Sequence, residues 1–136
     1  MNTEVSYMYR DGANWKTRSS VVLKGAISPE QEKRIWENLV DELLFIPEAI
    51  GLLSLAPETW GSDDHPWHEL TALKLTEREP DQEFLDMSVG KFVRKIEKMT
   101  VKDWEKIGAD IGIRHALEDD DDDADYDDDE EDKSIE

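Results

Sequence analysis

The sequence predicts an α+β domain, in which a small, largely antiparallel sheet is covered by helices, followed by a disordered acidic tail. Three observations indicate this class. Apolar and polar residues alternate along residues 5–10, apolar residues recur at helical spacing along residues 28–44, and residues 118–136 hold fourteen acidic residues and one lysine. We therefore expect the order β-β-α-β-α-α in one domain over residues 1–117. Residues 118–136 are expected to form a tail that cannot fold alone, because like charges repel and little apolar surface is present.

The first two strands are expected to form a hairpin. Val5, Tyr7 and Tyr9 alternate with their neighbours, the turn signal Asp11-Gly12 follows, and residues 19–23 resume the strand pattern. A third strand is expected over residues 67–76, on either edge of the hairpin. Its alternation is imperfect, which indicates a bulge or a strand that is covered on both faces.

The strongest helix signal runs from Ser28 to Leu44. Ser28 is a capping residue, Pro29 suits the first helical position, and Gln31 completes a capping box. The apolar residues that follow recur at spacings of three and four, and these are Ile35, Trp36, Leu39, Val40 and Leu43. We expect one helix over this whole segment, with its apolar stripe against the sheet.

Two more helices are expected in the second half of the chain. One begins near Asp86 or Ser88 and ends near Met99, and the other follows the capping pair Thr100 and Asp103. The residues of this last helix that should face inward are Val101, Trp104, Ile107 and Ile111. Residues 45–53, broken by a proline and a glycine, are expected to lie across the core.

Charge and composition restrict the classes of function. The net charge is −19, of which −13 belongs to residues 118–136, leaving −6 for residues 1–117. This balance argues against direct binding to nucleic acid or to an anionic membrane and favours a basic protein partner or simple solubility. The chain has no cysteine, no signal-peptide pattern and no apolar run of about 20 residues, so we expect a cytoplasmic protein without a membrane span.

The predicted hairpin loop is the first candidate binding site. Arg10, Asp11, Asn14 and Lys16 surround Trp15, and a tryptophan on a loop is a frequent interface anchor. The alternative is that Trp15 folds back over the edge of the sheet. Trp60, in a second predicted loop, is the other aromatic candidate for an interface.

The acidic tail is the second candidate, for electrostatic capture of a basic surface. Its densest carboxylate runs supply the candidate residues, which are Asp121, Asp122, Asp123, Asp127, Asp128 and Asp129. The alternative is that the tail only keeps the protein soluble.

The segment 63–69 is a weaker candidate for a metal site. Asp64, His65, His68 and Glu69 are residue types that bind zinc, iron or manganese, but in an extended segment they project to opposite sides. The alternative is that these side chains satisfy local backbone groups. No nucleophile motif or phosphate-binding loop is present in the sequence, so neither an enzyme nor a cofactor is expected.

Three sets of residues resemble a loose group of small uncharacterised proteins from bacteria and their phages. They are Tyr9-Arg10-Asp11 with Asn14-Trp15-Lys16, Phe45-Ile46-Pro47 with Ile50-Gly51-Leu52, and Asp64-His65 with Trp67-His68-Glu69-Leu70. The resemblance covers roughly residues 5–75 and implies no activity.

The function that the sequence favours is a non-enzymatic binding module for a basic, nucleic-acid-handling partner. A phage- or bacterium-encoded inhibitor, or an immunity protein, that acts by acidic mimicry would fit. The alternatives are a small metal-dependent hydrolase or nuclease that uses residues 63–69, and a structural subunit of a larger assembly.

Overall fold

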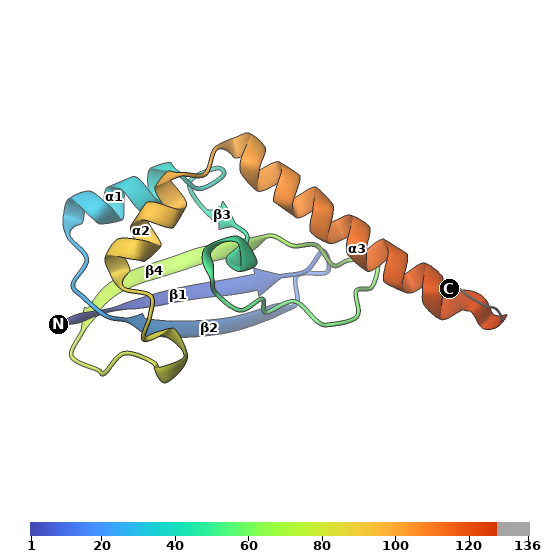
Figure 1. Ribbon diagram of the computed structural model, residues 1–136, viewed down its shortest axis with the longest axis horizontal. Helices are drawn as coiled ribbons and strands as arrows, with labels where there is room; N and C mark the ends of the chain where they lie inside the picture. The colour runs from blue at the N-terminus through green and yellow to red at the C-terminus, as the bar shows by residue number, and fades with distance from the viewer. Residues whose placement is uncertain (128–136) are drawn as a thin grey trace.

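The computed structural model describes the backbone of residues 1–127 and the side chains of residues 1–116. One four-stranded sheet of order β2-β1-β4-β3 lies beneath three helices (Figure 1). The strands are β1 (Asn2–Arg10), β2 (Lys16–Leu23), β3 (Leu44–Phe45) and β4 (His68–Thr76). The helices are α1 (Pro29–Glu37), α2 (Val89–Glu97) and α3 (Val101–Asp127), with two short 3₁₀ turns, η1 (Pro47–Ile50) and η2 (Gln82–Phe84). The predicted α+β class and element order are confirmed.

All strand pairs in the sheet are antiparallel. β1 pairs with β2 without a break from Thr3 opposite Leu23 to Arg10 opposite Lys16, so the predicted hairpin is confirmed. The predicted third strand is β4, which pairs with the other edge of β1 and makes β1 a central strand. A two-residue strand, β3, completes the sheet beyond β4 and was not predicted, because its local pattern is too short to read.

The imperfect alternation of the third predicted strand is the mark of a bulge. Ser6 of β1 lies opposite Ala72 of β4 but Tyr7 lies opposite Leu70, so Thr71 has no opposite residue. One extra residue in a strand moves every later side chain to the opposite face of the sheet. Leu70 and Leu73 are therefore both buried although they are three residues apart.

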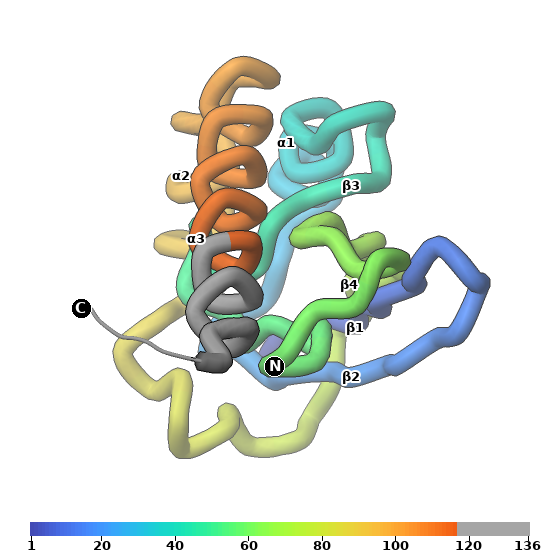
Figure 2. The backbone as a smooth tube through the Cα atoms, turned by 90° about the vertical axis from the view of Figure 1, so that its right-hand side faces the viewer, coloured from blue at the N-terminus to red at the C-terminus, as the bar shows by residue number. Residues whose placement is uncertain are grey.

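The core lies between the sheet and the helices. Val5 and Tyr7 of β1 pack with Phe92 and Ile96 of α2 and with Trp104 of α3, and all five are buried. Seen along the molecule in Figure 2, the three helices lie on one side of the strands. Residues 45–53 do lie across the core as predicted, since Ile46, Ile50 and Leu52 are buried.

The helix predicted from Ser28 to Leu44 is wrong in its length. Its start is confirmed, with the capping box of Ser28 and Gln31 formed on both sides, but α1 ends at Glu37. The chain then turns through Asp41 and Glu42, both with left-handed backbone angles, and enters β3. The carbonyl of Asn38 accepts a hydrogen bond from the Trp104 indole N–H at 3.0 Å. The apolar residues after Glu37 therefore form a turn and the strand β3, where they make tertiary contacts, and do not continue the apolar stripe of the helix.

The last helix begins where the sequence predicts. Thr100 and Asp103 exchange hydrogen bonds at 3.0 and 3.1 Å, which forms the predicted capping box. Trp104 and Ile111 face inward as expected, but Val101 is more than half exposed, so that prediction is wrong. The backbone of α3 continues to Asp127, past the predicted start of the tail at residue 118.

Candidate functional site

The hairpin loop between β1 and β2 is held by one carboxylate. The Asp11 side chain accepts hydrogen bonds from the backbone N–H groups of Ala13 and Trp15 at 2.9 and 2.8 Å. The Asp11 N–H donates to the Trp15 carbonyl at 3.0 Å, and the Asn14 N–H donates to the Asp11 carbonyl at the same distance. Asn14 takes the left-handed conformation that asparagine tolerates, with φ of 70°. The loop therefore has a defined shape set by Asp11.

Trp15 is presented to solvent by this loop. Its side chain is 77% exposed, so of the two expectations for Trp15 the structure has the open one, and the indole does not cover the edge of the sheet. The loop is also tied to the segment 61–67, because the Gly12 N–H donates to the Asp63 carbonyl at 2.9 Å. A large aromatic side chain on a braced loop loses little conformational freedom on binding, which suits an interface anchor.

The other predicted aromatic anchor is placed differently. The indole of Trp60 stacks on the imidazole of His115 in α3, with ring centroids 3.9 Å apart and planes 5° apart. Trp60 also packs against the core and is only partly exposed. Its main contact is therefore structural, joining the loop before β4 to α3.

The charges around Trp15 differ in how they are paired. Arg10 makes an ion pair with Glu69 of β4 at 3.0 Å, and its guanidinium donates to the Asn14 amide oxygen at 2.7 Å. Within the described side chains, Lys16 makes no ion pair. Glu69, predicted as a metal ligand, is thus the partner of Arg10, and the free positive charge beside Trp15 is that of Lys16.

A groove of about 350 Å³ lies beside the hairpin loop. It is lined by Arg10, Asp11, Leu44, His65, Trp67 and Glu69. From the sequence alone, Arg10 and Asp11 were expected in one candidate site and His65 and Glu69 in another, and the structure brings the two sets together. Leu44 and Trp67 were missed as site residues, because only the pairing of β3 with β4 brings Leu44 to this place.

Both ring nitrogens of His65 are used by backbone groups. Its Nδ1 accepts the Trp67 N–H at 3.1 Å, and its Nε2 lies 2.7 Å from the carbonyl oxygen of Arg10. These partners fit one neutral tautomer, in which Nε2 carries the proton and donates.

The neighbouring Asp64 accepts from the Tyr9 hydroxyl at 2.6 Å and from the Gly61 N–H at 2.7 Å. Burial, and next to it this contact with the Asp64 carboxylate, raise the pKa of Tyr9 above its usual value.

His68 is fully buried and is also saturated by the backbone. Its Nε2 accepts the Leu55 N–H at 2.9 Å, and its Nδ1 lies 2.9 Å from the Pro66 carbonyl oxygen, to which it donates in the neutral form. Burial lowers the pKa of His68 to about 4. His68 therefore connects the segment 53–55 to β4 as a neutral side chain.

The predicted metal candidates do not converge on one point. Among residues 1–116, no group of three or more His, Asp and Glu side chains could hold a metal ion. A metal bound by His65 or His68 would first have to displace a backbone hydrogen bond, which favours the expectation that these side chains satisfy local backbone groups.

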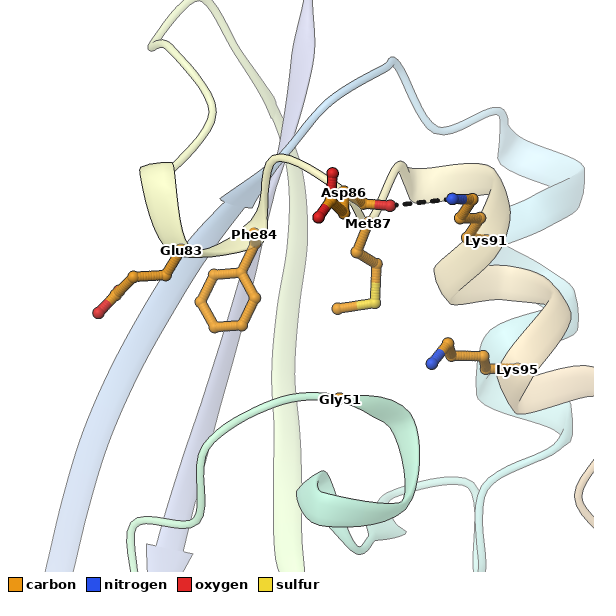
Figure 3. Close-up of a pocket in the computed structure, with 7 residues that line it drawn as sticks. All are labelled: Gly51, Glu83, Phe84, Asp86, Met87, Lys91 and Lys95. Atoms are coloured by element: carbon orange, nitrogen blue, oxygen red, sulfur yellow. Dashed lines mark hydrogen bonds between the residues drawn. The ribbon is translucent and has the colours of Figure 1, made fainter.

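A second cavity, of about 330 Å³, lies away from all the predicted site residues (Figure 3). Gly51, Phe84 and Met87 line it together with the side chains of Lys91 and Lys95 and the acidic residues Glu83 and Asp86. Figure 3 shows the Lys91 ammonium donating to the backbone carbonyl oxygen of Asp86, at 3.1 Å. Gly51 lies more than thirty residues before the other lining residues, which all fall within 83–95, so no local sequence signal could have found this cavity.

The structure describes only some of the predicted tail residues, and of those only the backbone. Asp121, Asp122, Asp123 and Asp127 belong to the last turns of α3, whose side chains are outside the described residues. Asp128 and Asp129 lie outside the described residues altogether. The tail therefore remains a candidate on its charge alone.

Comparison with known proteins adds no relative. No protein family, no curated protein and no solved structure matches the chain. The resemblance to small bacterial and phage proteins stays a prediction. Within the described residues, no helix has the length and apolar character needed to cross a membrane.

Proposed function

We propose that this protein is a non-enzymatic binding module for a basic macromolecular partner, with Trp15 as the anchor. The observation that carries the proposal is the exposure of Trp15 on a loop that Asp11 closes through hydrogen bonds to its backbone. A tryptophan held in place before binding is the kind of residue that contributes most to an interface.

The acidic residues supply the second part of the proposal. Fourteen carboxylates in residues 118–136 create a strong negative field, which accelerates association with a basic surface and weakens as salt screens it. A nucleic-acid-handling protein has such a surface, and a polyanion competes there with the nucleic acid. An inhibitor or immunity protein encoded by a phage or a bacterium is the biological role that we propose for this chemistry.

The experiment is affinity capture from host lysate with the full-length chain and three variants, followed by affinity measurement on the retained protein. Trp15→Ala removes the anchor, and a second variant lowers the net charge of the tail from −13 to −7 by changing its six candidate aspartates to asparagine. Leu85→Ala is the matched control, because Leu85 is another exposed large apolar residue and lies far from the hairpin loop. It follows η2, and Asp81, just before η2, contacts β2 at Val22, the end remote from that loop.

We expect a basic protein to be retained by the unchanged chain and by Leu85→Ala. Trp15→Ala should weaken its binding about 30-fold, the effect of losing an interface hot spot of about 2 kcal/mol. The tail variant should slow association and flatten the salt dependence. If the same partners bind all four chains equally, or if the unchanged chain retains no basic protein, the proposal is wrong.

A further inference from the structure

β2 is an edge strand, and the described residues occupy only half of its outer edge. Near its C-terminal end, the Val22 N–H donates to the Asp81 carboxylate at 2.9 Å, and the Asp81 N–H donates to the Val22 carbonyl at 3.0 Å. One step further, the Lys24 carbonyl accepts the Val89 N–H at 2.8 Å. Even-numbered residues of this segment therefore direct their backbone groups away from β1.

The same row continues unoccupied toward the hairpin. Because the pairing of β1 with β2 has no break and a strand has a period of two, Ser20 and Arg18 also direct their N–H and carbonyl groups outward. No hydrogen bond joins these groups to any other described residue. Figure 1 shows the length of β2 between the hairpin loop and the segment that covers its far end. Unpaired backbone groups on an edge strand are a template for another strand.

The charge along the open half of the edge is positive. Lys16 and Arg18 are both exposed, and within the described side chains neither makes an ion pair. Beside them a shallow depression of about 330 Å³ is lined by Ser6, Tyr7, Arg18, Ser19, Ser20 and Thr71. Side chains of an added strand that project to this face would meet a guanidinium and several hydroxyl groups, which suit carboxylates.

We propose that the Lys16–Ser20 edge of β2 binds an acidic, extended peptide segment of a partner protein as an additional strand. The chain itself provides the precedent, since Asp81 already pairs with this edge at Val22 through both its backbone and its carboxylate. A second copy of the chain is a poorer occupant, because pairing two such edges would bring the positive charges of Lys16 and Arg18 from both copies close together. This inference does not depend on the basic partner proposed above.

The test uses the full-length chain and a labelled peptide in which glutamate alternates with threonine. We expect the backbone amides of Arg18 and Ser20 to shift in NMR spectra and to exchange more slowly with solvent. The amides of Thr17 and Ser19, which face β1, should change little. Attraction between opposite charges without strand addition would not produce this alternation. A peptide with lysine in place of glutamate should not bind.

Two substitutions at one position separate the backbone contact from the side chain. Ser20→Pro removes the outward N–H, a change that an edge strand tolerates, and Ser20→Ala keeps it. We expect Ser20→Pro to weaken peptide binding about tenfold relative to Ser20→Ala, the effect of a lost hydrogen bond. Arg18→Glu should abolish binding.

Three results would overturn the proposal. The first is equal binding by the Ser20→Pro and Ser20→Ala variants. The second is peptide binding that perturbs amides outside β2 and leaves Arg18 and Ser20 unchanged. The third is slow exchange of the Arg18 and Ser20 amides in the absence of peptide that becomes slower as the protein concentration rises. That result would assign the edge to a second copy of the chain.

Discussion

The buried, neutral His68 makes stability depend on pH in a defined window. Burial lowers the pKa of His68 to about 4 in the folded protein, against 6.5 for an unperturbed histidine. Above pH 6.5 the imidazole is neutral in both states and contributes no pH dependence. Between pH 6.5 and about 4 the unfolded chain binds a proton that the folded chain does not, so the free energy of unfolding falls as the pH falls.

The size of this effect follows from the difference between the two pKa values. Each pH unit inside the window removes about 1.4 kcal/mol, so about 3 kcal/mol is lost by pH 4. That is a large fraction of the free energy of unfolding of a typical domain, which is about 5–15 kcal/mol. The physical reason is that a protonated His68 could no longer accept the Leu55 N–H and would carry a charge in the core.

The assay is urea unfolding at several pH values between 7 and 4.5 for the natural chain and for His68→Gln. The carboxylates titrate in both proteins, so the difference between them isolates His68. At pH 7 the variant should be less stable by about 1–3 kcal/mol, because the flexible glutamine amide does not hold both the Leu55 N–H and the Pro66 carbonyl in the geometry of the imidazole ring. This difference should shrink by about 2–3 kcal/mol on lowering the pH to 4.5. A difference that does not change with pH, or a His68 pKa near 6.5 by NMR, would refute the reasoning.

Three further predictions concern α3. Gly112→Ala should raise the free energy of unfolding by about 1 kcal/mol, since an added Cβ meets nothing within 4 Å. Gly108→Ala should raise the free energy of unfolding by less, or lower it, because its Cβ would lie 3.1 Å from Ile46 Cδ1. Thermal and urea unfolding compare the two variants. Thr100→Ala should cost about 1 kcal/mol through loss of the capping box, and Thr100→Ser, which keeps the hydroxyl, should restore most of it in the same assay. Trp104→Ala should cost about 3–5 kcal/mol, because the side chain is completely buried; a loss below about 1 kcal/mol in urea unfolding would contradict the packing described.

The features that could be predicted from sequence are those that adjacent residues decide. The capping boxes of Ser28 with Gln31 and of Thr100 with Asp103 form as expected, because each needs only residues three apart. The hairpin and the bulge in β4 are of the same kind, since a period of two and its interruption are visible in the chain. The charge of residues 118–136 is likewise a property of composition.

The features that sequence could not predict depend on residues far apart in the chain. α1 ends at Glu37 because the residues beyond it lead into β3, whose partner β4 lies more than twenty residues later. Trp15 and Trp60 look alike in sequence, as aromatic residues in polar loops. His115 covers one of them, while the other stays exposed.

The candidate site shows the same division. Residue types and spacing were enough to select the hairpin loop and the segment 63–69, because loops with charged and aromatic residues are readable as such. Only the tertiary structure decided that the Arg10 carbonyl would engage His65 and that the Leu55 N–H would engage His68. It alone left the outer backbone groups of Ser20 without a partner among the described residues, because a strand becomes an edge only through the order in which strands assemble.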